Sequence, residues 1–212
     1  MLKQIRRKTF LQDFIRIQVG FILFGIAIAM MIRANLGTSS WAVLEVAESK
    51  IFNITPGTMT VINGFLIIIA VLLLKEPIGW GTLGNILCIG PWEDFALWLI
   101  PSVKNNLPLQ SAMLLVAIFL MGLASAIYIG VDAGAGPRDS MMLAVKRTTG
   151  LSLRMARAII EITVVIVGWL LGGPAGIGTI IYAILVGQAV QWGFKLFRVE
   201  PHRELDSEVE DG

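Results

Sequence analysis

The sequence predicts an all-α polytopic membrane protein with six transmembrane helices, arranged as two inverted three-helix repeats. Three observations carry this prediction: a membrane-like composition, a tandem internal repeat and an asymmetric distribution of basic residues. Hydrophobic residues make up 56% of the 212 residues and charged residues only 15%, whereas about a quarter of an ordinary soluble domain is charged. The composition therefore favours a chain that lies within the lipid bilayer.

The internal repeat is marked by the motif Pro-x-Gly-x-Gly-Thr, which occurs at residues 77–82 and again at 174–179, 97 positions later. At this offset residues 14–90 align without a gap on residues 111–187, with 17 identical pairs in 77. The motif is not a phosphate-binding loop, because it lacks the following lysine and a preceding strand. We interpret each copy as a tight turn that begins the third span of its repeat.

Repeat one is expected over residues 14–100. Its first span, about residues 15–32, follows a basic start as a signal peptide would. Its twin in repeat two argues for a transmembrane helix, because a cleaved signal should not be duplicated inside the mature fold. Residues 41–52 are too few and too charged to cross, and form an interfacial or re-entrant helix. Two further spans, each near the roughly 20 residues that a bilayer core requires, are expected at 58–74 and 78–99.

Repeat two, residues 111–197, follows the same plan after an external linker at 101–110. The sequence predicts spans at 111–130, 155–171 and 176–196, and a short amphipathic or re-entrant helix at 138–149. Residues 1–13 form a basic cytoplasmic N-terminus. Residues 198–212 form an acidic cytoplasmic tail, which we expect to be disordered because it has almost no apolar residues.

The basic residues predict the orientation. With six spans and both termini in the cytoplasm, 14 Lys and Arg residues lie inside and only Arg33, Lys50 and Lys104 lie outside. This follows the positive-inside rule. Because each repeat has three spans, an odd number, the two repeats enter the membrane from opposite sides.

The residue types that are scarce exclude several classes of protein. Cys88 is the one cysteine and His202 the one histidine, so neither a His/Cys metal site nor a Ser/His/Asp or Cys/His catalytic system is expected. A net charge of +2 does not suggest nucleic-acid binding. We therefore expect no catalytic residues, no metal and no cofactor; the expected partners are the lipid bilayer, a small-molecule substrate and a second copy in a homodimer.

The substrate site is expected at the two breaks that follow the first span of each repeat. Transporters with inverted repeats bind substrate near the bilayer midplane, between the repeats and beside broken helices. Helix starts there offer free N–H groups that suit an anionic ligand. The alternative is that these residues only form turns and helix caps. The candidate binding residues are Asn35, Thr38, Ser39, Ser40, Asp132, Arg138, Asp139 and Glu161.

Polar residues within spans are a second indication of function, because ionisable groups are expensive there. Glu161 has Arg157 four residues earlier, so a helical ion pair and a proton or substrate role both remain open. Glu93 and Asp94 follow a Gly-Pro pair that we expect to bend the helix; their counterparts in repeat two are uncharged. The secondary polar candidates are Glu93, Asp94, Asn63 and Asn85, and the two asparagines could equally bond a neighbouring helix.

Four glycine-rich segments, residues 35–41, 78–85, 134–139 and 172–179, resemble those of the YczE branch of the YczE/YyaS/YitT bacterial integral membrane proteins. The resemblance covers about residues 14–195. It implies a helical polytopic fold in the bacterial inner membrane, and it assigns no substrate, reaction or functional residue. Ser40 departs from the family pattern, in which proline is expected.

Three functions remain open. The leading hypothesis is a small transporter-like permease in which one half rocks against the other. The second is a substrate-binding membrane subunit that needs an energising partner. The third is an accessory or scaffold protein that uses the basic residues between Arg138 and Arg157, although these residues are also accounted for as a topology signal and a contact for anionic lipid.

Overall fold

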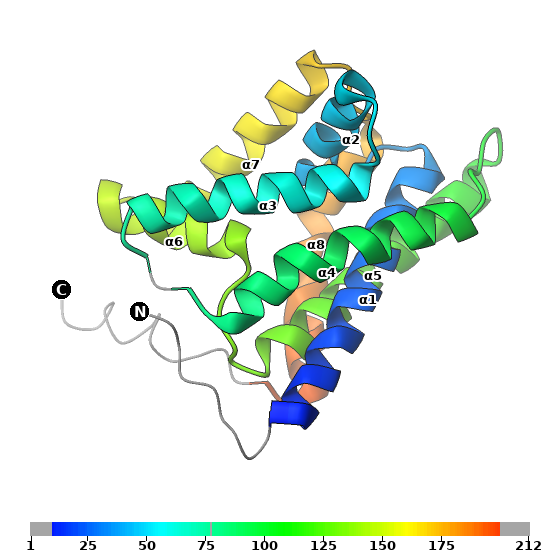
Figure 1. The fold of residues 1–212 in the computed structure, drawn as a ribbon. Coiled ribbons are helices and arrows are strands. Elements are labelled where there is room, and N and C mark those ends of the chain that lie inside the picture. The colour runs from blue at the N-terminus through cyan, green and yellow to red at the C-terminus, as the bar shows by residue number, and fades with distance from the viewer. Residues whose placement is uncertain (1–9, 77, 200–212) are drawn as a thin grey trace.

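The computed structural model describes residues 10–76 and 78–199, which form eight α-helices and no strand (Figure 1). The all-α prediction is confirmed for these residues. The first half of the chain contains α1 (Phe10–Ala34), α2 (Ser40–Phe52), α3 (Pro56–Leu73) and α4 (Trp80–Leu99). The second half contains α5 (Leu107–Ile129), α6 (Pro137–Thr149), α7 (Leu153–Leu170) and α8 (Ile177–Phe197).

Each half has the same order of helices: one long helix, one short helix of 13 residues and two longer helices. The short helices α2 and α6 lie where the sequence predicts them. The linker between the halves is shorter than expected, because α5 already begins at Leu107, where the Asn106 side chain accepts a hydrogen bond from the Leu109 N–H (3.2 Å). Most of the expected N-terminal basic segment and acidic tail lie outside the described residues.

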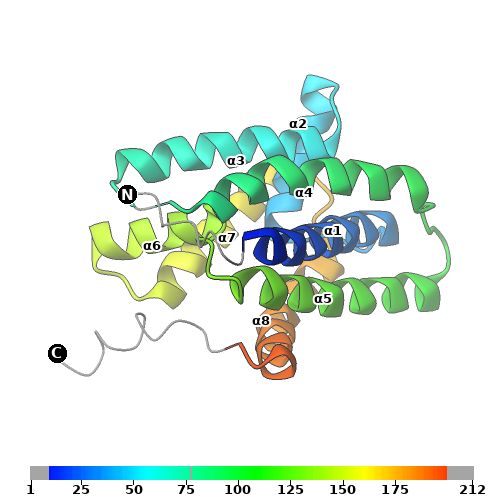
Figure 2. The same cartoon turned by 60° about the horizontal axis from the view of Figure 1, so that its bottom comes forward.

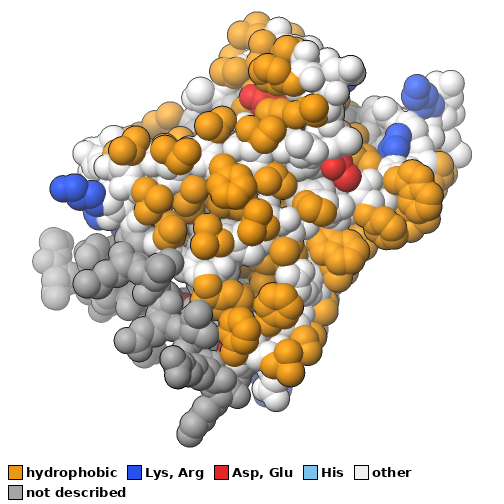
Figure 3. Space-filling view, in the orientation of Figure 1, with side chains coloured by type: hydrophobic (Ala, Val, Ile, Leu, Met, Phe, Trp, Pro, Cys, Tyr) orange, Lys and Arg blue, Asp and Glu red, His pale blue; other side chains and the backbone are white. Residues whose placement is uncertain are grey.

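Four of the described helices, α1, α3, α5 and α8, are long and apolar enough to cross a membrane. Helices α4 and α7 occupy expected spans but carry charged residues within them: Glu93 and Asp94 in α4, and Arg154, Arg157 and Glu161 in α7. The outer face of the molecule is rich in apolar side chains, and in Figure 3 the Lys and Arg side chains lie at its margins. This surface is suited to lipid.

The long helices pack as a row, and Figure 2 shows them in the order α3, α4, α1, α5 and α8. The core of the row is built from buried residues such as Phe21, Ile28 and Met121. The second group of helices, α2, α6 and α7, packs beside the row, with α2 and α6 both contacting α3 and α7.

Small residues allow the helices of the row to approach closely. A Cβ atom on Gly25 in α1 would lie 2.7 Å from the backbone N of Glu93 in α4. A Cβ atom on Gly122, the counterpart of Gly25 at the 97-residue offset, would lie 2.4 Å from the backbone of Ala189 in α8. Helix α1 therefore approaches α4 as closely as α5 approaches α8.

The two helix breaks and the two Gly-x-Gly-Thr motifs meet crosswise, each break against the motif of the other half. The Gly178 N–H donates to the Leu36 carbonyl (2.7 Å), which joins the loop after α1 to the start of α8. The Gly81 N–H donates to the Ala133 carbonyl (2.9 Å), which joins the loop after α5 to the start of α4. Donors and acceptors of the two bonds are counterparts at the 97-residue offset.

The same crossed contact explains the residue types of the motif. Gly37 and Gly134, in the two breaks, have φ angles of +112° and +118°, which favour glycine. The threonine of each motif accepts a hydrogen bond from the glycine that precedes its helix: Gly79 N–H to Thr82 Oγ1 (3.2 Å) and Gly176 N–H to Thr179 Oγ1 (3.3 Å). The motif is therefore a helix start that also binds the backbone of the opposite half.

Substituting alanine at Gly79 should destabilise the protein by about 1–3 kcal/mol, because overpacking forces the backbone apart. The new Cβ atom would lie 2.0 Å from the Ala133 carbonyl oxygen. Thermal unfolding in detergent checks this. Gly187→Ala is the matched control, since nothing lies within 4 Å of its added Cβ; alanine in a helix should leave the melting temperature equal or higher. Equal melting temperatures for Gly79→Ala and wild type would contradict the crossed contact.

Candidate functional site

A cavity of about 140 Å³ lies between the two halves, and residues from both halves line it. Many of these residues lie near the middle of their helices, as Phe24 does in α1, Gly64 in α3, Met121 in α5 and Glu161 in α7. An apolar cavity of about this size holds a molecule as large as benzene, so the volume suits a small ligand.

The lining is built largely from positions that are counterparts at the 97-residue offset. Twelve of its 21 residues form six such pairs. The pairs are Phe24 and Met121, Trp41 and Arg138, Thr60 and Arg157, Gly64 and Glu161, Asn85 and Tyr182, and Ile89 and Val186. The two halves thus meet at the cavity through equivalent surfaces that differ in chemistry.

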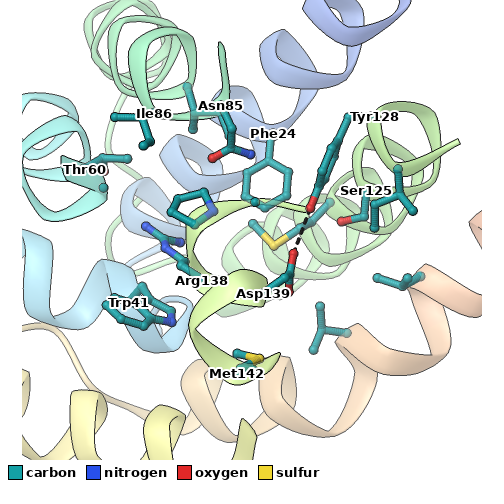
Figure 4. A pocket seen from close by; sticks show the side chains of 18 of the residues that line it. Phe24, Trp41, Thr60, Asn85, Ile86, Ser125, Tyr128, Arg138, Asp139 and Met142 are labelled. Carbon is teal, nitrogen blue, oxygen red and sulfur yellow. Dashed lines mark hydrogen bonds between the residues drawn. The ribbon is translucent and has the colours of Figure 1, made fainter. Parts of the chain in front are cut away.

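Arg138 is the central cation of the cavity wall (Figure 4). Its guanidinium donates to the carboxylate of Glu45 on α2, which is fully buried. Its Cζ atom also lies 5.1 Å from the centroid of the Trp41 ring, within the range of a cation–π contact. Arg138 therefore joins α6 to α2 across the two halves.

The second half supplies three further charged side chains, Asp139, Arg157 and Glu161. Tyr128 donates to Asp139 Oδ2 (3.0 Å), so the end of α5 is joined to the first turn of α6 (Figure 4). On α7, Arg157 Nε donates to Glu161 Oε1 (2.9 Å). The helical ion pair, one of the two alternatives that the sequence leaves open, is present, and both of its members also line the cavity.

Behind the wall of the first half lies a group of buried polar side chains. Thr60 Oγ1 donates to Glu93 Oε2 (2.8 Å), and Glu93 is fully buried. Asn63 Nδ2 donates to Glu48 Oε2 (2.6 Å). The pKa of the Glu48 carboxyl is raised above its usual value, chiefly by burial. The hydrogen bond from Asn63 lowers this pKa, and the nearby Glu45 raises it.

Four of the residues proposed from the sequence line this cavity: Arg138, Asp139, Glu161 and Asn85. Glu93 and Asn63 lie in the polar group behind it. Asp94 accepts hydrogen bonds from Thr55 Oγ1 (2.5 Å) and the Gly57 N–H (2.9 Å), which joins α4 to the start of α3.

The remaining proposed residues, all from the two breaks, do not line the cavity. Asn35 Nδ2 donates to Ser102 Oγ (2.7 Å) and the Val103 carbonyl (3.0 Å), so its side chain ties the first break to the linker. Thr38, Ser39 and Ser40 are buried at the start of α2. Asp132 lines a separate hollow with Arg16 and Arg198.

Sequence reasoning missed Trp41, Glu45, Tyr128 and Tyr182. The first and last could have been found by applying the repeat offset to residues already proposed, because Trp41 is the counterpart of Arg138 and Tyr182 that of Asn85. Glu45 lies in the short helix that the sequence predicts to be interfacial or re-entrant, and it was not among the proposed residues. Its burial follows from the contacts of α2 with α3 and α7, which periodicity within one helix does not reveal.

The arrangement offers hydrogen-bonding groups for a small polar molecule. Guanidinium groups at Arg138 and Arg157 offer N–H donors, while Asp139 and Glu161 offer carboxylate acceptors. The buried Trp41 Nε1, which lacks a hydrogen-bond partner, is a further donor. In the described residues no group of three His, Cys, Asp or Glu side chains could hold a metal ion.

Comparison with known proteins agrees with the resemblance described above. A family model described as "Family of unknown function (DUF6198)" matches residues 11–195. An uncharacterized protein of Haemophilus influenzae is 34% identical over 189 residues, which cover 85% of this chain and 82% of that protein. The uncharacterized membrane protein YczE of Bacillus subtilis is 30% identical over 172 residues, covering 79% of each chain. YyaS of Bacillus subtilis is 28% identical over 176 residues, covering 80% of this chain and 86% of its own. No solved structure matches.

Replacing Arg138 by methionine should destabilise the protein by about 3–5 kcal/mol, because it leaves the buried Glu45 carboxylate without its cation. The double variant Glu45→Gln/Arg138→Met should be clearly more stable than Arg138→Met alone, since the uncompensated charge is gone. Thermal unfolding of the two single variants and the double variant measures this coupling. If the destabilisation of the double variant equals the sum of those of the two single variants, Glu45 and Arg138 do not stabilise each other, and the prediction is wrong.

Proposed function

This chain belongs to the DUF6198 family, with YczE and YyaS among its relatives, and we propose that it is a small transporter-like permease. The proposed permease lies in the bacterial cytoplasmic membrane with six spans, including α4 and α7, and with both termini in the cytoplasm. Its ligand would be a small molecule with charged groups. The observation that carries this proposal is the cavity lined by six pairs of repeat counterparts.

The paired lining supports a ligand site on the axis that would relate two inverted halves. Secondary transporters built from inverted repeats bind their substrates at the repeat interface near the bilayer midplane. The cavity satisfies both conditions if the helices cross the membrane, since it lies between the halves and at mid-helix positions such as Gly64 and Glu161. The charged groups in its wall would be costly in lipid and are expected where a polar path exists.

Contacts between helix ends support the inverted orientation. The linker residue Val103 donates its N–H to the Arg33 carbonyl (2.9 Å), and Lys50 Nζ donates to the Gly172 carbonyl (3.3 Å). Arg147 forms an ion pair with Glu76 (3.3 Å). Each of these contacts joins segments that the positive-inside rule assigns to one side of the membrane: the first two outside and the third inside.

The two halves differ in a way that suits a rocking mechanism. In the first half α3 packs against α4, whereas α7 and α8 in the second half both line the cavity but do not pack along each other. The cavity wall is correspondingly richer in residues from the second half. A transporter with inverted halves would reach its second state by exchanging these two conformations, so that α7 and α8 close while α3 and α4 separate.

The charges of the cavity favour a ligand that carries both an acceptor and a donor group. Each guanidinium in the wall already binds a carboxylate: Arg138 binds Glu45 and Arg157 binds Glu161. An anionic group on the ligand would compete for these cations, and a donor group could bind Asp139. The scaffold alternative is less favoured, because Arg138, Arg147 and Arg157 are engaged within the protein.

Purified protein should be stabilised by at least one member of a panel of small charged metabolites, and proteoliposomes should take up that compound. Ser125→Phe should abolish both effects, because Ser125 is a buried wall residue on α5 and the larger side chain would fill the cavity. Val116→Phe on the exposed side of α5 is the matched control and should behave as wild type. The measurements are thermal shift and radiolabelled uptake, with and without a proton gradient.

No uptake of any panel member by folded wild-type protein would contradict an autonomous permease. Binding without uptake, together with a stoichiometric ATPase in pull-downs, would instead identify a substrate-binding subunit. Uptake that survives Ser125→Phe would move the transport path away from this cavity.

A further inference from the structure

Two fully buried carboxyl groups, Glu45 on α2 and Glu93 on α4, lie behind the cavity wall of the first half. Each touches a residue of the wall. Arg138 donates to Glu45 Oε1, and Thr60 donates to Glu93 Oε2 (2.8 Å). The substrate site as described makes no use of the second oxygen of either group.

Those second oxygens, Glu45 Oε2 and Glu93 Oε1, are buried and have no hydrogen-bond partner among the described residues. Glu45 forms an ion pair with the Arg138 guanidinium, whereas the hydrogen bond that Glu93 accepts within the described residues comes from the neutral Thr60 hydroxyl. A buried carboxylate without a cation is very unfavourable, and such a group is normally neutral. Of the two acids, Glu93 is therefore the candidate for a bound proton.

The surrounding charges favour the same assignment. The charged side chains that act on Glu93 are Glu45 from α2, Asp94 from α4 itself and Arg138 from α6, so one cation faces two further carboxylates. Glu48 lies on α2 near Glu45. Binding of a proton by Glu93 would reduce this excess of negative charge.

The repeat offset indicates when the proton could move. The counterparts of Glu45 and Glu93 in the second half are Met142 and Val190. Both of these line the cavity, whereas Glu45 and Glu93 are sealed from it. If the two halves exchange conformations, the first half adopts the arrangement that the second half has in this structure. Glu45 and Glu93 then take the places of their counterparts and line the cavity.

We propose that Glu93 is a proton-binding site, with Glu45 as its charged neighbour, that is occluded in this conformation and opens to the cavity in the opposite one. The proposal rests on the permease function and its inverted halves. Glu93 would take one proton from water in the open state and become a neutral carboxylic acid. Closing would bury the neutral group, and release would require the half to open again. Transport would in this way be coupled to a proton gradient.

Infrared difference spectroscopy of the wild-type protein in lipid nanodiscs tests the site with the proton itself as the probe. At neutral pH the wild type should show the C=O stretch of a protonated carboxyl group in an apolar environment, and the band should disappear on titration to high pH. Glu93→Gln should remove the band, and Glu93→Asp should retain one at a shifted position. Glu161→Gln and Glu48→Gln are the controls, and each should keep the Glu93 band.

Absence of the band from wild type, or its persistence in Glu93→Gln, would overturn the proposal. If Glu93→Gln does not fold, the shifted band of Glu93→Asp makes the same assignment, and an unshifted band in that variant would overturn it. If sodium ions remove the wild-type band at constant pH, the site binds a metal cation in place of the proton, and the proposal of a proton site is wrong. A band that behaves as expected in a protein that transports no panel compound would leave the proton site standing and contradict only the permease function.

Discussion

The fold depends on a crossed contact, in which the break after the first helix of each half binds the backbone at the start of the last helix of the other. Two hydrogen bonds form this contact, from the Gly178 N–H to the Leu36 carbonyl and from the Gly81 N–H to the Ala133 carbonyl. The backbones lie so close that neither glycine has room for a side chain. Buried backbone groups need hydrogen-bond partners within the protein. Each irregular segment therefore supplies a partner for the backbone of the other half.

This constraint also positions the cavity. Each break is held against the opposite half, so the short helix that follows it, α2 or α6, begins next to that opposite half. Trp41 at the start of α2 therefore contacts Arg138 at the start of α6. The halves share a plan but differ in side chains: Trp41, Thr60 and Gly64 of the first half have Arg138, Arg157 and Glu161 as their counterparts in the second. Because of these differences, the interface between the two similar backbones is lined by polar and charged side chains. The buried acids Glu45 and Glu93 occur in the first half, and their counterparts in the second half are apolar.

Much of the fold could be predicted from the sequence, because the repeat and the hydrophobic runs are local or periodic signals. The helices and their order within each half follow from these signals. The breaks were correctly located, but their side chains Asn35, Thr38 and Ser39 do not line the cavity. Which face of a helix meets a cavity depends on contacts such as those of α2 with α7, and no single-helix pattern reports these. The position of the Gly-x-Gly-Thr motif at a helix start was predicted, but its contact with the opposite break was not, since that partner lies in the other half of the chain.

The central claim, that the two halves are inverted and meet at a shared ligand site, is tested most directly by labelling matched loop positions in intact cells. Asn53 and Gly150 are counterparts that end α2 and α6, and Lys75 and Gly172 are counterparts that follow α3 and α7. In a Cys88→Ser background, single cysteines at Asn53 and Gly172 should react with a membrane-impermeant maleimide from outside. Cysteines at Lys75 and Gly150 should react only after permeabilisation. If both members of either pair react from the same side, the halves are parallel and the account is wrong.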